Sequence, residues 1–231
     1  MRQALLSASP LDVAALAFFA AAWLGYSVAV EATAAGRRTL NALMNGHREA
    51  WMERMLAREN RIVDTTIMAS LQNGTAFFAS TSLLAIGGAL ALVQSPDELV
   101  SLFGEVGGAP ASRLAWELKV IGLAVIFVYA FFKFAWSFRL LNYGAILVGA
   151  VPPFTDADRP EAIAAARRAA AMNAVAGQHF NRGQRAYFFA LAYLGWFVGP
   201  WVFMAATAAV LLVMWRRQFA SDARAAVLIE G

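Results

Sequence analysis

The sequence predicts an all-α membrane protein, a bundle of four transmembrane helices. Four long apolar segments indicate this class, at roughly residues 11–32, 67–93, 114–138 and 186–215. Each meets the length of about 20 apolar residues that a helix needs to cross a hydrocarbon core about 30 Å thick. The composition agrees, because 60% of the residues are hydrophobic and only 15% are charged. In a chain of 231 residues four spans leave no room for a separate soluble domain, so we expect a single integral membrane domain.

The first span has a well-marked start. Ser9-Pro10-Leu11-Asp12 combines a capping serine, a proline in the first turn and an acidic residue at the third position. Val30-Glu31-Ala32 loosely resembles a signal-peptide cleavage site, which is the alternative interpretation of this segment. The apolar run is longer than the usual signal, and Arg37 and Arg38 follow it directly, so we expect a span that is not cleaved.

Small residues repeat along two of the spans. One helix face of the first span carries Ala17, Ala21, Gly25 and Ala29. The last span contains Gly195 and Gly199, followed by Pro200, which should kink or loosen the helix. Small side chains let helix backbones approach closely in a bilayer. They predict helix-packing faces, either inside this bundle or against a partner.

The first and third connections predict helices of their own. Residues 37–63 combine an apolar side with an arginine-rich side, as in helices that lie in the membrane interface. Docking against the bundle or against a partner is the other interpretation. In the third connection Pro152-Pro153 ends one helix, and an alanine-rich helix follows over 159–180. We expect Asn181-Arg182-Gly183 to break that helix before the last span.

The second span is the least apolar, and its polar residues share one stripe: Thr66, Ser70, Asn73 and Ser80. We expect this stripe to face protein, because a polar side chain that faces lipid lacks a partner. Lys133 in the third span is an ionisable group of the kind that marks a membrane pathway. Its closeness to Trp136 and Arg139 also permits the alternative that its ammonium reaches the headgroups.

The distribution of basic residues predicts an orientation. Twelve arginines fall in the first and third connections, and five lie on the opposite side: Arg2, Arg113, Arg216, Arg217 and Arg224. Basic loops are retained in the cytoplasm, so we expect cytoplasmic connections and periplasmic termini. The Arg216–Arg217 pair argues against this and leaves the inverted orientation open. The formal charge of +4 then indicates anionic lipid headgroups as partners, rather than nucleic acid.

The residue types that most often hold metals or cofactors or act as catalysts are scarce in this sequence. The chain has no cysteine, and its two histidines, His47 and His179, lie outside the spans. This excludes a haem held within the membrane by two histidines of this chain, as well as thiolate and iron–sulfur sites. We identify no glycine-rich phosphate loop or nucleophile elbow. We therefore expect a protein that is not an enzyme and that holds no cofactor.

Several strings in combination resemble an uncharacterised membrane family, the domain of unknown function 599. They are Arg58–Asp64, Leu71–Asn73, Phe77–Thr81, Phe132–Arg139, Phe180–Gly183 and Arg185–Phe188. The resemblance implies a four-span protein of the bacterial inner membrane and implies no activity. The strings cluster near the predicted cytoplasmic ends of the spans, which predicts one polar surface or pocket formed by Asn60, Arg61, Asp64, Asn73, Lys133, Arg139, Asn142, Asn181 and Arg182.

Two functions fit this sequence. The first is a non-catalytic accessory or structural subunit that associates with itself or with a larger membrane complex. The second is a small oligomeric transporter or channel, with a polar path along the second and third spans. We prefer the first, because no acidic or carbonyl-rich filter pattern is visible. Lipid or quinone binding in an apolar groove is compatible with both.

Overall fold

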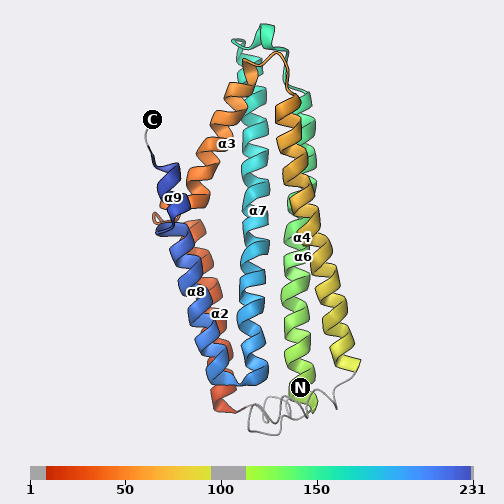
Figure 1. Cartoon of the computed structure of the whole chain (residues 1–231), viewed down its shortest axis with the longest axis vertical. Coiled ribbons are helices and arrows are strands. Elements are labelled where there is room, and N and C mark those ends of the chain that lie inside the picture. The colour runs from red at the N-terminus through yellow and green to blue at the C-terminus, as the bar shows by residue number, and fades with distance from the viewer. Residues whose placement is uncertain (1–8, 95–112, 230–231) are drawn as a thin grey trace. The chain divides into compact units, whose positions relative to one another are not determined.

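The computed structural model describes residues 9–94 and 113–229, and within these ranges the chain is helical and has no strand (Figure 1). The elements are α2 (Pro10–Ala32), η1 (Gly36–Arg38), α3 (Leu40–Leu56), α4 (Ile62–Gln94), α6 (Arg113–Gly149), η2 (Phe154–Asp156), α7 (Pro160–Val198), α8 (Pro200–Phe219) and α9 (Asp222–Val227). Arg2 and most of the second connection lie outside the described residues. Four segments are long and apolar enough to cross a membrane: Pro10–Ala32, Ile62–Val93, Arg113–Gly149 and Pro200–Val227. The predicted all-helical class with four such segments is confirmed.

The described residues group into two compact units. Unit 1 comprises those within Met1–Leu40, Ser82–Tyr129 and Arg185–Gly231, and unit 2 those within Asn41–Thr81 and Ala130–Gln184. Three helices, α4, α6 and α7, contribute residues to both units. They contain 33, 37 and 39 residues. At 1.5 Å per residue each is roughly 50–60 Å long, well beyond the hydrocarbon core of about 30 Å. A single crossing therefore leaves part of each helix outside the hydrocarbon.

In unit 1 the end of α7 runs antiparallel to α2. The start of α2 meets the end of α7, where the Trp196 indole N–H donates to Asp12 Oδ1 at 2.7 Å. The end of α2 meets an earlier part of α7, where Arg185 pairs with Glu31 at 2.6 Å. As predicted, Ser9 caps α2, because its side chain accepts from the Asp12 N–H at 3.1 Å.

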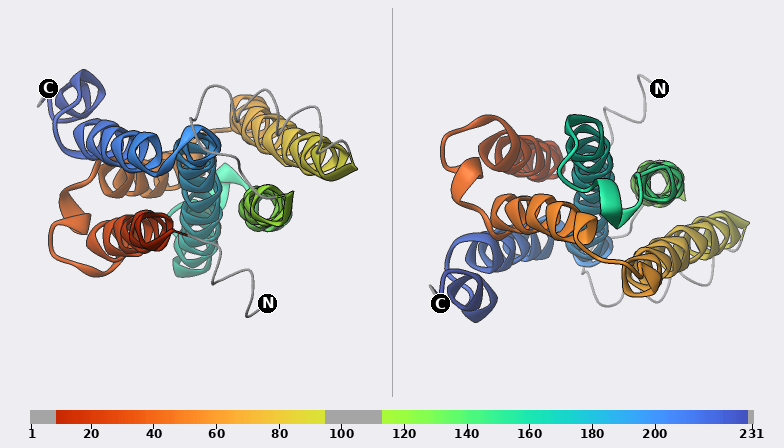
Figure 2. Two further views of the ribbon diagram at one scale, coloured as in Figure 1. Left: turned by 90° about the horizontal axis from the view of Figure 1, so that it is seen from below. Right: turned by 90° about the horizontal axis from the view of Figure 1, so that it is seen from above.

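Helices α2 and α8 pack against each other and run in the same direction (Figure 1). Near the ends of both helices, the Tyr26 hydroxyl donates to the Met214 carbonyl at 3.2 Å. Closer to their starts, the rings of Phe19 and Phe203 lie 5.0 Å apart. The short helix α9 lies beside the end of α8 (Figure 2).

The segment 186–215, predicted as one span, is divided between two helices. Helix α7 ends at Val198 and α8 begins at Pro200. The two helices pack tightly at the break, because a Cβ added to Gly195 would lie 3.1 Å from the Val202 carbonyl oxygen. Proline suits the first position of a helix, where its missing N–H costs no intrahelical hydrogen bond. The chain therefore turns back after Gly199 instead of continuing through a kink.

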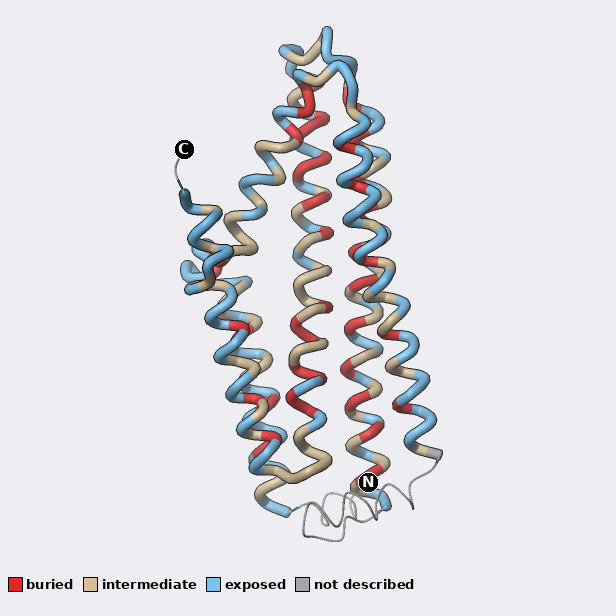
Figure 3. The backbone as a smooth tube through the Cα atoms, in the orientation of Figure 1, coloured by how far each residue is buried: buried red, intermediate tan, exposed pale blue. Residues whose placement is uncertain are grey.

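In unit 2 the core is built largely from the alanines of α7 and the methionines of α3 and α4. Buried residues recur along α7, as Figure 3 shows, and include Ala162, Ala166, Ala169 and Ala176. They pack in one cluster with Met52, Met55 and Met68. Small alanine side chains allow large neighbours to fill the space between helices. Placement of α3 and of the start of α7 at the membrane interface stays a prediction.

The prediction that Asn181–Gly183 ends a helix is wrong, because α7 continues through it to Val198. Gly183 is buried, and a Cβ there would lie 2.7 Å from ring carbons of Phe134. The glycine therefore permits close contact between α6 and α7 and does not mark a turn. The break predicted at Pro152-Pro153 is confirmed, because α6 ends at Gly149 and α7 begins at Pro160.

We expect Gly195→Val to destabilise the protein. The added carbons meet backbone atoms of Val202 and Phe203, which cannot move without displacing the start of α8. Overpacking of this kind costs about 1–3 kcal/mol, or a fall in the melting temperature of about 3–9 °C for a chain of this size. The test is thermal unfolding of the purified protein in detergent. Gly88→Val on α4 is the control, because beyond the adjoining backbone of its own helix no atom lies within 4 Å of its added Cβ. An equal fall in both variants would contradict the prediction.

Candidate functional site

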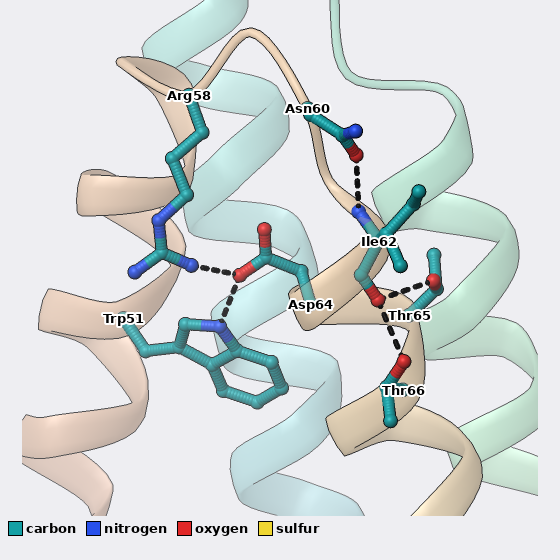
Figure 4. Close-up of polar contacts among 7 residues, drawn as sticks. All are labelled: Trp51, Arg58, Asn60, Ile62, Asp64, Thr65 and Thr66. Carbon is teal, nitrogen blue, oxygen red and sulfur yellow. Dashed lines mark hydrogen bonds and ion pairs between the residues drawn. The ribbon is translucent and has the colours of Figure 1, made fainter.

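The centre of the candidate site is Asp64, a buried carboxylate at the third position of α4 (Figure 4). One carboxylate oxygen, Oδ1, accepts from the Trp51 indole N–H at 2.7 Å and from the Arg58 guanidinium. The other oxygen, Oδ2, is buried and has no hydrogen-bond partner among the described residues. A negative charge in the first turn of a helix also interacts favourably with the helix dipole. Asp64 therefore joins α3, the connection after it and the start of α4.

The residues around Asp64 complete the start of α4. Asn60 Oδ1 accepts from the Ile62 N–H at 2.9 Å, which satisfies a backbone donor at the helix N-terminus (Figure 4). The hydroxyls of Thr65 and Thr66 donate to the Ile62 carbonyl at 2.9 and 2.8 Å. These contacts are local, so Asn60 acts here as a helix cap.

Arg61 joins two connections that are far apart in sequence. Its guanidinium donates to the carbonyls of Val151 at 2.8 Å and of Pro152. Beside it lies an open hollow of about 620 Å³, lined by Glu59, Asn60, Arg61, Pro153 and Phe154. The two carbonyls follow the end of α6, where no further helical turn supplies them with donors. Arg61 therefore fixes the connection from α3 to α4 against the connection from α6 to α7.

A second group of polar contacts lies between the helices of unit 2. The Gln72 amide donates to Asn142 Oδ1 at 2.8 Å, and the Ser137 hydroxyl donates to the Ala176 carbonyl at 2.8 Å. Asn173 is buried and donates to the Ala169 carbonyl on its own helix at 3.1 Å. Asn142 was predicted from the sequence, whereas Ser137 and Asn173 were not, because single polar residues in apolar or alanine-rich helices form no pattern.

The remaining predicted residues are placed differently. Arg139 is exposed and donates to the Tyr143 hydroxyl on its own helix at 2.8 Å. Lys133, Asn181 and Arg182 are partly buried, and Asn73 is exposed on α4. All nine predicted residues belong to unit 2. The hydrogen bonds described above for five of them, Asn60, Arg61, Asp64, Arg139 and Asn142, go to residues outside the predicted set. The single surface that the sequence suggests stays a prediction.

Arg48 is a further charged group of unit 2 that the sequence analysis did not select. Burial lowers the pKa of its guanidinium. The side chain donates to Asn45 Oδ1 at 2.8 Å and lies where a Cβ on Gly177 would be 2.9 Å from its Nη2. Gly177 therefore provides the space that admits a cation between α3 and α7.

The small residues predicted as packing faces line a groove in unit 1. Ala21, Gly25 and Ala29 of α2 face residues of α8 across a space of about 490 Å³. Ala17 is exposed beside it, and Gly195 and Gly199 lie at the turn between α7 and α8.

No group of three histidine, cysteine, aspartate or glutamate residues suitable for a metal occurs in the described part of the chain. In unit 2 the hydrogen bonds of Arg61, Asp64, Gln72 and Ser137 join different helices or connections.

We expect Asp64→Ala to destabilise the protein, because the Trp51 indole N–H and the Arg58 guanidinium lose their shared acceptor. Loss of one partner from a buried, charged hydrogen-bond group costs about 2–3 kcal/mol when the cation is part exposed, as Arg58 is. The melting temperature should then fall by about 5–10 °C. Asp158→Ala, which removes an exposed carboxylate, should leave it unchanged. Equal melting temperatures for Asp64→Ala and the parent chain would contradict the role of Asp64.

Comparison with known proteins agrees with the resemblance found in the sequence. The chain matches, over residues 14–223, a family described as protein of unknown function, DUF599. No match was found among curated proteins or among solved structures. Because the family match covers nearly all of the described residues, the chain belongs to the DUF599 family of proteins of unknown function.

Proposed function

We propose that this protein is a non-catalytic accessory or structural protein of the bacterial inner membrane that associates with a second copy of itself through α4. The observation that carries the proposal is a row of exposed residues on this helix: Thr66, Ser70, Asn73, Phe77 and Ser80. They follow one another at steps of four, three, four and three residues. This is the 3.5-residue repeat with which two helices pack along a shared seam.

The residue types in this seam favour a second copy as the partner. Copies inserted in the same direction are related by a two-fold axis along the membrane normal, so each seam residue meets its own counterpart. A charged side chain would then face a like charge, and the seam contains none. Amides and hydroxyls both donate and accept hydrogen bonds, so each can pair with itself. Asn73, at the middle of the seam, is the type of residue that sets the register of paired helices.

Exposure of the seam residues to lipid is unfavourable unless another helix covers them. Phe77 is 65% exposed, and Ser70, Asn73 and Ser80 lie in a segment apolar enough to cross the membrane. In hydrocarbon a polar side chain without a partner is unfavourable, whereas across a helix interface it is satisfied. The sequence predicts that this polar stripe faces protein. In unit 2 of the single chain it faces outward, so a second chain is needed to meet that expectation.

The second candidate function is a small oligomeric transporter or channel. The same polar seam, together with Lys133 on α6, would then line a path between copies. Two seams that pack together exclude water from their residues, whereas a transport path leaves the same residues in contact with water. Solvent access to the seam in the oligomer therefore distinguishes the two functions.

Cysteine crosslinking tests the seam. Because the chain has no natural cysteine, any disulfide between copies of the chain must come from the introduced residue. We expect Thr66→Cys, Asn73→Cys and Ser80→Cys each to give a disulfide-linked dimer when native membranes are oxidised. Leu71→Cys is the control, because it is exposed on α4 but lies about 140° from the seam at 100° per residue. Dimers at position 71 as strong as those at 66, 73 and 80, or no dimer at any seam position, would overturn the proposal.

Two further readouts separate the candidate functions. Extraction in mild detergent, followed by size analysis and mass spectrometry, identifies a dimer or a larger membrane complex that contains the chain. Modification of Asn73→Cys by a membrane-impermeant thiol reagent, in membranes opened to both sides, should be slow if the seam is paired and dry. Fast modification in the assembled oligomer would instead support a water-filled path.

We also propose that the end of α7 and the whole of α8 both cross the membrane. The residues from Arg185 to Trp196 reach from the end of α2 to its start, and α8 then returns in the direction of α2. The end of α8 therefore lies on the side where α2 ends. This arrangement places Arg216, Arg217 and Arg224 on the same side as the two basic connections. That side then carries fifteen arginines and the opposite side two, a larger difference than the twelve against five counted for four spans.

Reporter fusions test this arrangement. We expect a fluorescent reporter fused after Val227 to be cytoplasmic, whereas a chain cut after Val198 should place a periplasmic phosphatase reporter in the periplasm. The reason is that α8 adds one crossing between these two points. The same location for both reporters would contradict the return of α8 across the membrane.

A further inference from the structure

The groove between α2 and α8 in unit 1 has an apolar lining from end to end. It is lined by Phe18, Ala21, Ala22, Gly25, Tyr26, Ala29, Ala208, Leu211, Leu212 and Trp215. Beyond the adjoining backbone of its own helix, no atom lies within 4 Å of a Cβ added to Gly25, so there is space at the floor of the groove. Its volume of about 490 Å³ falls within the range of small-molecule sites.

The length of the groove matches one leaflet of a bilayer. From Phe18 to Ala29 the helix rises about 16 Å at 1.5 Å per residue, close to half of a hydrocarbon core of about 30 Å. A transmembrane helix of a partner would need a surface about twice as long. The groove is thus suited to one or two acyl chains of a lipid.

Five arginines lie at or just after the ends of α2 and α8, the two helices that line the groove, and we call them the arginine collar: Arg37, Arg38, Arg216, Arg217 and Arg224. Arg37 and Arg38 form η1, which folds closely against the last turn of α2, because a Cβ on Gly36 would lie 2.5 Å from the Val30 carbonyl oxygen. Arg216 and Arg217 occupy the last turn of α8, directly after Trp215.

Two arginines of the collar make side-chain contacts within unit 1. The Arg224 guanidinium donates to the Arg38 carbonyl at 3.0 Å, which ties α9 to η1. The Arg217 guanidinium lies 5.0 Å from the centre of the Phe188 ring. Behind the groove the Arg185 guanidinium lies 5.7 Å from the Tyr26 ring and pairs with Glu31, and its Nη1 has no hydrogen-bond partner among the described residues.

From this arrangement we infer that unit 1 binds an anionic phospholipid, with an acyl chain in the groove and the phosphate at the arginine collar. The five guanidiniums supply charge complementary to an anionic headgroup, and each basic residue near an anionic membrane surface contributes about 1 kcal/mol. Guanidinium also binds phosphate oxygens in a bidentate manner. The apolar lining supplies no partner for a polar or charged group along the rest of the ligand.

The test is native mass spectrometry of the full-length protein, titrated with phosphatidylglycerol and with phosphatidylcholine. The parent chain should bind phosphatidylglycerol more tightly. Arg216→Gln with Arg217→Gln should weaken phosphatidylglycerol about thirtyfold, from two lost contributions of about 1 kcal/mol each, and should narrow the difference in affinity between the two lipids by the same factor. Arg167→Gln with Arg168→Gln, an adjacent exposed pair on α7, is the matched control and should change neither affinity.

A second pair of variants tests the groove itself. Gly25→Leu should fill the floor and weaken both lipids, and Ala21→Leu should do the same if Gly25→Leu folds poorly. Ala20→Leu is the control, because Ala20 is exposed on α2 and does not line the groove. The inference is overturned if Gly25→Leu and Ala21→Leu bind phosphatidylglycerol as the parent does, if the parent binds both lipids equally, or if the groove variants release a bound protein and leave the lipid in place. None of these readouts depends on pairing through α4.

Discussion

A backbone N–H or C=O that leaves a helix inside a bilayer finds no water to replace its partner, and this constraint governs most of the structure. It favours long uninterrupted helices, such as the 39 residues of α7. The same constraint applies to side-chain hydroxyl groups, which also need hydrogen-bond partners inside the protein. Thr75 and Thr207 are buried, and each donates to the carbonyl four residues earlier on its own helix, both at 2.8 Å. A threonine satisfied in this way packs as an apolar residue, so it adds no requirement for a polar partner.

The charged contacts follow from the same constraint, because ions are least costly where a helix ends and backbone groups are free. Asp64 lies in the first turn of α4, and Arg61 binds carbonyls that follow the end of α6. In unit 1 the pair of Glu31 and Arg185 lies at the end of α2. These contacts set which helix ends adjoin, while the apolar stretches between them are held by packing. The polar residues of the family strings therefore fit a role in holding the fold together.

The sequence predicted the helical class, the four apolar segments, the cap of α2 and the break at Pro152-Pro153, because each depends on local properties. The failures concern glycine. Gly183 resembles a helix breaker but serves close packing against Phe134, and Gly195 admits the first turn of α8. Hydropathy averages cannot detect a reversal within an apolar run, so two helices were predicted as one. Asp64 was identified among the polar residues near the predicted cytoplasmic ends of the spans, but its partner Trp51 was not, since the pairing depends on how α3 returns to α4.

Two exposed faces of this chain, the α4 seam and the groove between α2 and α8, differ in the chemistry of their side chains. The α4 seam carries three hydroxyls, one amide and one aromatic ring, each of which can pair with its identical counterpart, so it suits a copy of the same helix. The groove of α2 and α8 has apolar walls and a cationic end, an asymmetry that a symmetric partner does not match but a phospholipid does. Small residues alone predict only close approach. The polar or charged groups beside them determine whether a helix or a lipid makes that approach, and in this chain those groups differ between the two faces.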